Sequence, residues 1–180
     1  MTDFRLDMEN PIQSFTNTHF GIMFQLDRLG ELPALLAPFE LARKIAGQSM
    51  EYFKKTMHEH HQAEERLLFP AVLQSAQIDR ERTNVESLIE VLEAQHSVLE
   101  SLWKKIEPDL KQVAKGMPHK LDTDALTQLV NHYREHAQME EGEFLPLAQT
   151  ILSRNPNHME ALDLSIHLMH PPYFSGNNLT

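Results

Sequence analysis

The stretch that decides the fold is His60-His-Gln-Ala-Glu64-Glu-Arg-Leu-Leu-Phe-Pro70, because the chain contains it twice. The second copy, His136-Ala-Gln-Met-Glu140-Glu-Gly-Glu-Phe-Leu-Pro146, begins 76 residues later. The copies share the first histidine, a glutamine, a Glu-Glu pair, two large apolar residues and the proline. A lone histidine, His19 or His96, precedes each copy by about 40 residues. The chain is therefore interpreted as two related helix pairs, each with one lone histidine and one His-x-x-x-Glu motif.

Apolar residues recur at steps of three and four along four stretches, which is the spacing of one face of a helix. The predicted helices cover Pro11–Gly30, 39–76, 79–116 and 123–153, with Asn10, Asp79 and Asp122 as expected N-caps. Strand signals are nearly missing. Long helices with short connections pack as antiparallel neighbours. We therefore predict an all-α fold, an up-down-up-down four-helix bundle.

The domain is expected to cover residues 1–154. Residues 155–180 differ in character and are expected to form a C-terminal extension, with a short helix near His158–Leu168 and a frayed polar end, SGNNLT. Pro70 and Pro146 each remove one helical hydrogen bond, so we expect the second and fourth helices to bend just beyond the His-x-x-x-Glu turns.

The composition is that of one globular domain. The chain has 180 residues, of which 41% are apolar and 23% charged. A net charge of −10 disfavours nucleic acid as a partner. We find neither a membrane span nor a signal peptide, so no membrane partner is expected. Cysteine is absent, which excludes thiolate metal sites and cysteine nucleophiles and fits a cytoplasmic location.

Polar residues interrupt the apolar face of each predicted helix. They are His19 on the first helix, His60 and Glu64 on the second, His96 on the third, and His136 and Glu140 on the fourth. Burying such groups without partners is unfavourable, and one metal centre would satisfy all six together.

A second pair, His61 and Glu65, has the same spacing as His60 and Glu64. His61 aligns with Ala137 in the repeat, and the pair is expected to lie beside the apolar face. The periodicity and the repeat both favour His60 and Glu64 as ligands.

The duplicated HxxxEE motif with its two lone histidines resembles the hemerythrin-like (HHE cation-binding) domain family over roughly residues 11–153. The resemblance implies a four-helix bundle holding two iron ions with an oxo or hydroxo bridge. Oxygen-carrying hemerythrins use five histidines and have a second histidine on the third helix, where this chain has Glu100. The chain is more similar to bacterial members with four His and two Glu. Those include the di-iron domain of iron–sulfur cluster repair proteins, whose N-terminal cysteine segment is missing here.

Histidine and carboxylate ligands without thiolate suit iron or manganese and also accept zinc. If Glu64 and Glu140 bridge two irons, each iron receives two histidines and one position stays open for a diatomic ligand. His132 is the best additional ligand candidate. Glu65, Glu100 and Glu141 are expected on a solvated face or as hydrogen-bond acceptors of ligand histidines, and the alternative for Glu100 is that it fills one metal position. Tyr133 is expected to pack in the core, with its hydroxyl near the metals as the second interpretation.

The leading hypothesis is a non-haem di-iron protein that binds O2 or NO for sensing, scavenging or carriage, rather than an enzyme. The first alternative is a di-iron oxidase, peroxidase or NO reductase. The second is a regulatory module that responds to iron or oxygen. A homodimer is one assembly that the sequence allows.

Overall fold

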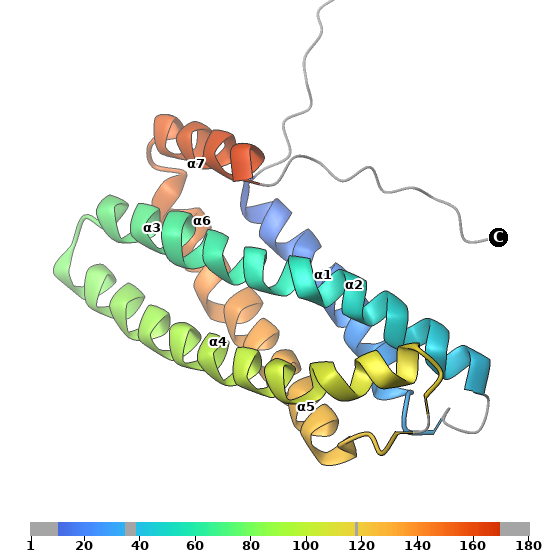
Figure 1. The fold of residues 1–180 in the computed structure, drawn as a ribbon. Helices are drawn as coiled ribbons and strands as arrows, with labels where there is room; N and C mark the ends of the chain where they lie inside the picture. Colours follow the sequence, from blue (N-terminus) through green and yellow to red (C-terminus); the bar gives the residue numbers. More distant parts are fainter. Residues whose placement is uncertain (1–10, 35–38, 118, 170–180) are drawn as a thin grey trace, which may run out of the picture.

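The computed structural model describes residues 11–34, 39–117 and 119–169, and they form long helices that pack side by side (Figure 1). In chain order the elements are α1 (Pro11–Gly30), α2 (Phe39–Ala63), the π-helical segment η1 (Glu64–Leu68), α3 (Phe69–Ser75), α4 (Asp79–Ala114), α5 (Thr123–Met139), the π-helical segment η2 (Glu140–Phe144), α6 (Leu145–Leu152) and α7 (Pro156–Met169). The runs α2–η1–α3 and α5–η2–α6 are each continuous, so the bundle has four long helical rods. The predicted all-α helical bundle is confirmed.

The helix ends follow local side-chain chemistry. The carboxylate of Asp122 accepts a hydrogen bond from the backbone N–H of Ala125 at 2.9 Å, which confirms it as the N-cap of α5. The predicted cap at Asp79 is wrong, because Asp79 is already the first helical residue and Ile78 holds the cap position in extended backbone. Asp79 instead places negative charge in the first turn, where the helix dipole favours it. The expected cap at Asn10 lies outside the described residues.

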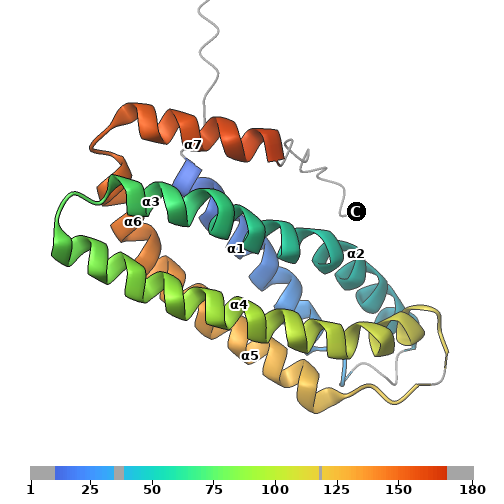
Figure 2. The same ribbon diagram turned by 60° about the vertical axis from the view of Figure 1, so that its left-hand side comes forward.

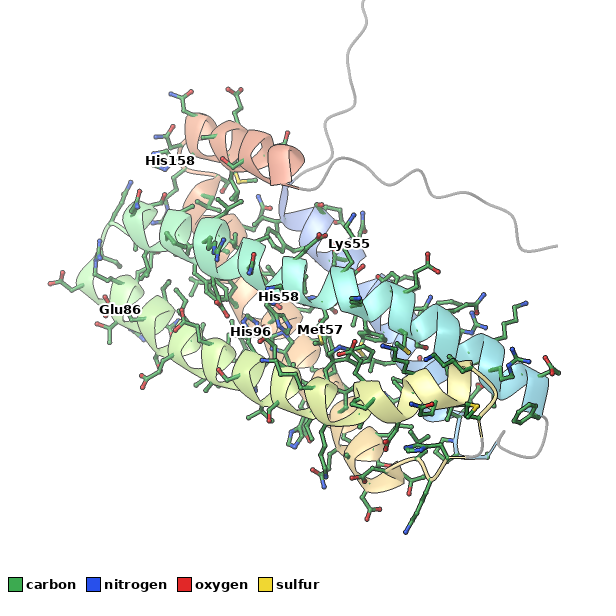
Figure 3. The ribbon with its side chains drawn as sticks, viewed as in Figure 1. Lys55, Met57, His58, Glu86, His96 and His158 are labelled. Atoms are coloured by element: carbon green, nitrogen blue, oxygen red, sulfur yellow. The ribbon has the colours of Figure 1, made fainter. Side chains whose placement is uncertain are left out.

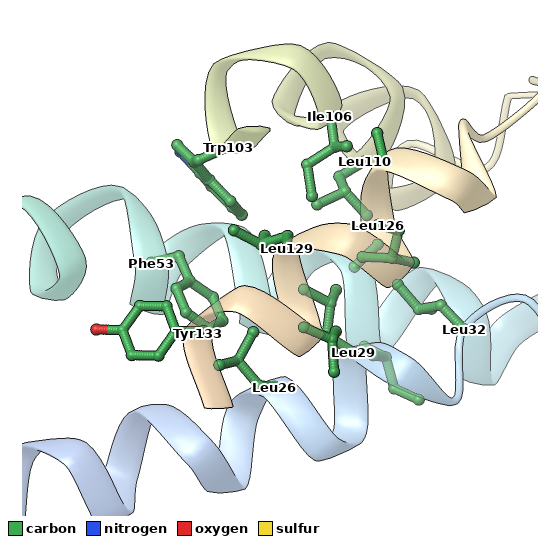
Figure 4. Packing of buried hydrophobic residues seen from close by; sticks show 14 of the residues in the cluster. Leu26, Leu29, Leu32, Phe53, Trp103, Ile106, Leu110, Leu126, Leu129 and Tyr133 are labelled. Carbon is green, nitrogen blue, oxygen red and sulfur yellow. The ribbon is translucent and has the colours of Figure 1, made fainter. Parts of the chain in front are cut away.

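Each rod packs against two neighbours: α1 contacts α2 and α5, and α4 contacts the same two helices. This arrangement closes the bundle and leaves two apolar clusters inside it. The cluster nearer the C-terminal end of α1 contains Leu26, Phe53, Trp103 and Leu129 (Figure 4). The other contains Phe15, Phe69, Leu92 and Phe144. Along every rod, the predicted metal ligands lie between the two clusters.

The helical hydrogen-bonding pattern changes at Glu64 and Glu140, the last residues of the two His-x-x-x-Glu turns. The bends expected just beyond these turns stay a prediction. In η1 the N–H of Phe69 donates to the carbonyl of Glu64, five residues back. In η2 the N–H of Leu145 donates to Glu140 in the same way. A π-turn adds one residue to the helical turn. This wider turn accommodates the proline that follows, which has no N–H to donate.

The C-terminal helix α7 packs against α1, η1, α3 and α6 at one end of the bundle (Figure 2). It is longer than the short helix expected near His158–Leu168, and Leu162 on it is buried. The expected frayed segment, residues 175–180, lies outside the described residues. Within the described part of the chain, no helix combines the length and apolar character needed to cross a membrane.

Candidate metal centre

The six ligands predicted from sequence are all buried in the middle of the bundle. Their exposed fractions are 0% for His19, Glu64, His136 and Glu140, 2% for His96 and 4% for His60. They come from four different rods, and Figure 3 shows His96 reaching from α4 towards α2. The structure thus brings together every residue of the predicted set.

One group of donor atoms comprises His19, His60, Glu64 and Glu140, whose ligating atoms all lie within 4.8 Å of one another. His60 Nε2 lies 3.0 Å from Glu64 Oε1, and His19 Nε2 lies 2.8 Å from Glu140 Oε2. Two imidazoles and two carboxylates at this separation can surround a single metal ion.

A second group comprises His61, His96 and His136, whose ring nitrogens meet the same 4.8 Å limit. The carboxylates of the first group also face this second one. Glu64 Oε2 lies 3.2 Å from His96 Nε2, and Glu140 Oε2 lies 3.5 Å from His136 Nε2. Glu64 and Glu140 therefore lie between the two groups of histidines, where each could bridge two ions.

His61 corrects the sequence-based interpretation. It was expected beside the apolar face, but only 1% of it is exposed, and neither ring nitrogen has a hydrogen-bond partner. Its ring stacks on His96 with centroids 4.0 Å apart and planes 8° apart. The sequence held one sign of this burial, because His61 follows the apolar Met57 by four residues. That spacing places His61, like His60, on the inner face of α2.

Carboxylates lie near the outer nitrogens of two of these histidines. Glu65 Oε1 lies 2.7 Å from His96 Nδ1, and Glu141 Oε1 lies 3.5 Å from His19 Nδ1. Because an ionised carboxylate only accepts, His96 donates its Nδ1–H to Glu65, and its Nε2 faces the centre. Of the two roles expected for Glu65 and Glu141, the structure favours the acceptor role for Glu65 only. Glu141 is 41% exposed, and His19 Nδ1 has no hydrogen-bond partner among the described residues.

Burial and charge set the protonation of the metal-free site. Burial lowers the pKa of His136 to about 3, which keeps its imidazole neutral and able to ligate. Burial, reinforced by the Glu64 carboxylate, raises the pKa of Glu140 to about 8. Burial opposes the charging of His19, but Glu140, Glu64 and Glu141 together outweigh it and raise the pKa of His19 to about 9. The negative charge of the site thus retains protons that a metal cation would displace.

Two other candidates from the sequence lie outside both groups. His132 is 49% exposed and its Nδ1 lies 3.5 Å from Glu135. Glu100 lies 3.3 Å from His58 Nδ1 and 3.9 Å from His61 Nδ1, on the outer side of the His61 ring. Tyr133, in contrast, is buried against the site, with its ring centroid 5.6 Å from that of His136.

The donor set fits a metal centre. Within the described residues, both oxygens of Glu64 and Glu140 and the Nε2 atoms of His60, His96 and His136 are buried and form no hydrogen bond of good geometry, although several of them lie 3.0–3.5 Å apart. Folded proteins rarely leave such atoms unsatisfied, and cations satisfy several of them at once. Fold and site together define a helical bundle with an internal cluster of histidines and carboxylates that fits a metal centre.

The family model of the hemerythrin HHE cation binding domain matches residues 10–148, and the chain belongs to this family. Comparisons with curated proteins and with solved structures found no match.

Proposed function

We propose that this chain holds two iron ions in a carboxylate-bridged centre and binds O2 or NO there. The observation that carries the proposal is the arrangement of donor atoms in two groups, with oxygens of Glu64 and Glu140 facing both. His19 and His60 would hold one ion, and His61, His96 and His136 the other. One ion would leave the donors of the second group unsatisfied.

The donor chemistry supports iron. Neutral imidazoles and carboxylates without thiolate suit iron and manganese, whereas zinc accepts the same donors without requiring them. Iron is also the choice that the family resemblance implies. When bound, a ferrous pair supplies electrons to O2 and an open coordination position for O2 or NO.

The surrounding residues support a small ligand. Every donor side chain is 4% exposed or less, so a bulky substrate does not reach these atoms in this conformation. Apolar clusters on both sides of the site exclude water, which strengthens electrostatic interactions within it. The chain's own residues therefore bind, orient and shield a diatomic ligand, which favours sensing, scavenging or carriage over turnover.

The test is metal loading followed by exposure to gas. Metal-free protein is loaded with Fe(II) under anaerobic conditions, freed of excess metal, analysed for iron and then mixed with O2 or NO while absorption is recorded. We expect two irons per chain and a new absorption band with either gas. Saturation at one iron contradicts the dinuclear centre, and stoichiometric zinc without iron uptake contradicts the redox role.

A matched pair of variants distinguishes iron bound at this site from iron bound nonspecifically elsewhere on the protein. Glu140→Ala removes a carboxylate that faces both groups, and Glu143→Ala removes an exposed carboxylate from the same π-helical segment. Only Glu140→Ala should lower the iron content. Equal iron content in both variants would show that the metal lies elsewhere.

A further inference from the structure

Tyr133 is a fully buried tyrosine whose hydroxyl has no hydrogen-bond partner among the described residues. Phenylalanine would fill the same space without burying a polar atom. Because a buried hydroxyl without a partner is unfavourable, we expect this hydroxyl to have a functional role. Apolar packing alone does not supply one.

The oxygen of Tyr133 is directed away from the apolar cluster. Figure 4 shows Leu26, Leu29 and Leu129 on one side of the ring and the hydroxyl on the opposite side. The ring lies at the boundary between that cluster and the metal centre. The apolar ring of Tyr133 thus packs against the cluster, and its hydroxyl lies on the side away from the cluster.

Metal-ligand candidates surround this boundary. Tyr133 lies one helical turn before His136 on α5, and the two ring centroids are 5.6 Å apart in an edge-on arrangement. The ring of His61 is nearly parallel to it, with centroids 6.1 Å apart and planes 21° apart. Tyr133 therefore contacts the second group of histidines from the side of the apolar cluster.

We propose that the Tyr133 hydroxyl donates a hydrogen bond to a small external ligand bound at the metal pair, of the class with a negatively charged or electron-rich outer atom. This inference rests on the proposed function and adds a specificity-determining residue to it. A phenol is protonated at neutral pH and so acts as a donor. The bond forms only when a ligand is present, which distinguishes it from a contact that holds the apo fold.

The consequence is selectivity among small ligands. A donor buried in an apolar surrounding favours a ligand whose outer atom accepts a hydrogen bond over one that offers none. It also retains the bound ligand, because dissociation leaves the hydroxyl unpaired again. Azide is a suitable probe, since it is anionic, small and accepts a hydrogen bond at its outer nitrogen.

The experiment compares wild-type, Tyr133→Phe and Tyr52→Phe proteins, each loaded with iron and oxidised. Tyr52 is a partly buried tyrosine of α2 and controls for the loss of a hydroxyl from the bundle. Iron content and thermal melting are measured first, and we expect no change in iron content in either variant. Azide affinity and the vibrational frequency of bound azide in H2O and D2O are then measured.

We expect Tyr133→Phe to bind azide about tenfold more weakly or worse, the size expected for a hydrogen bond to a charged acceptor. The shift of the azide band in D2O should disappear in this variant and persist in Tyr52→Phe. Equal affinity and an unchanged D2O shift in Tyr133→Phe would overturn the proposal. An intense phenolate-to-iron absorption band in wild-type protein, lost in Tyr133→Phe, would also overturn it by making Tyr133 a ligand. Wild-type protein that takes up no metal pair contradicts the proposed function itself.

Discussion

His60 and His61 are consecutive on α2, yet their rings face different helices. The ring of His60 meets that of His19 on α1 edge-on, with centroids 4.6 Å apart, while His61 stacks on His96 of α4. Because α2 packs between α1 and α4, two adjacent positions can both be internal. The site therefore offers three imidazoles on one side and two on the other.

We expect His61→Ala to lower the iron content from about two towards one per chain, because it removes one of the three nitrogens of the second group. His58→Ala is the matched control, since His58 lies on the same helix and its side chain is 57% exposed. Elemental analysis of both variants after identical loading checks this. If His61→Ala still binds two irons per chain, His61 is not a ligand and the four-histidine set predicted from the sequence holds.

Glu65 should matter through His96 and not through direct ligation. Its carboxylate lies 2.7 Å from His96 Nδ1 and fixes both the ring orientation and the position of the proton. Loss of such an outer partner typically weakens metal binding about 10–100-fold. Competition titration with a chelator should show this for Glu65→Ala, whereas the exposed Glu86 on α4 should be replaceable by alanine without effect.

The metal-free protein should lose stability in acid through His136. Its pKa is lowered by burial to about 3, whereas an unfolded histidine titrates near 6.5. As pH falls from about 6.5 towards 3, the unfolded chain binds a proton that the folded chain does not, so the free energy of unfolding decreases. Urea unfolding at several pH values should show a shallower decline for His136→Gln. The half-exposed His132, changed to Gln, serves as the control, and parallel curves for wild-type and His136→Gln would contradict the assignment.

At the scale of elements, the two π-helical segments carry the bridging candidates. Each segment begins with the glutamate that faces both groups and continues with the glutamate that contacts a ligand histidine. The helix that continues each rod has proline at its second residue, Pro70 or Pro146. The extra residue of the π-turn sets the direction of both carboxylates relative to the histidine one turn earlier.

We expect Pro70→Ala to favour a regular α-helix through η1, because the restored N–H can donate to the carbonyl of Arg66. The metal-free protein should then melt at a higher temperature, since proline inside a helix is disfavoured by about 3 kcal/mol relative to alanine. Metal affinity should fall, because Glu64 would turn away from its present direction. Thermal melting of the apo form and a chelator competition measure the two effects, and a gain in both would show that the π-turn does not serve the site.

The elements themselves were predictable because their apolar residues repeat at helical spacing. The burial of the six ligand candidates was predictable because these polar residues occupy positions of the apolar faces in both halves of the repeat. The π-segments were not, because a one-residue insertion in hydrogen bonding leaves the residue pattern nearly unchanged. His61 was missed for a related reason: the repeat selects one histidine for each turn, whereas helix packing decides how wide the internal face is. The cap at Asp79 failed because an acidic residue suits the first turn as well as the cap.

At the scale of the whole molecule, the candidate metal centre lies between the two apolar clusters and connects them. The two clusters lie on either side of a layer of buried histidines and glutamates drawn from α1, α2, η1, α4, α5 and η2. In the metal-free protein this layer holds polar atoms without hydrogen-bond partners. The centre is therefore expected to determine the stability of the entire bundle and not of one helix.

Removal of the metal should lower the melting temperature of the whole chain in a single transition. A ligand that binds only the folded state at about 100 times its dissociation constant adds about 2.7 kcal/mol. For a domain of this size, about 1 kcal/mol corresponds to about 2–4 °C, so the expected difference is about 5–10 °C or more. Calorimetry of the iron-loaded and chelator-treated protein measures it, with the chelator-treated sample reloaded to show reversibility. A second, separate transition in the apo protein would mean that the two apolar clusters unfold independently, and coincident melting curves would place the bound metal outside the layer between them.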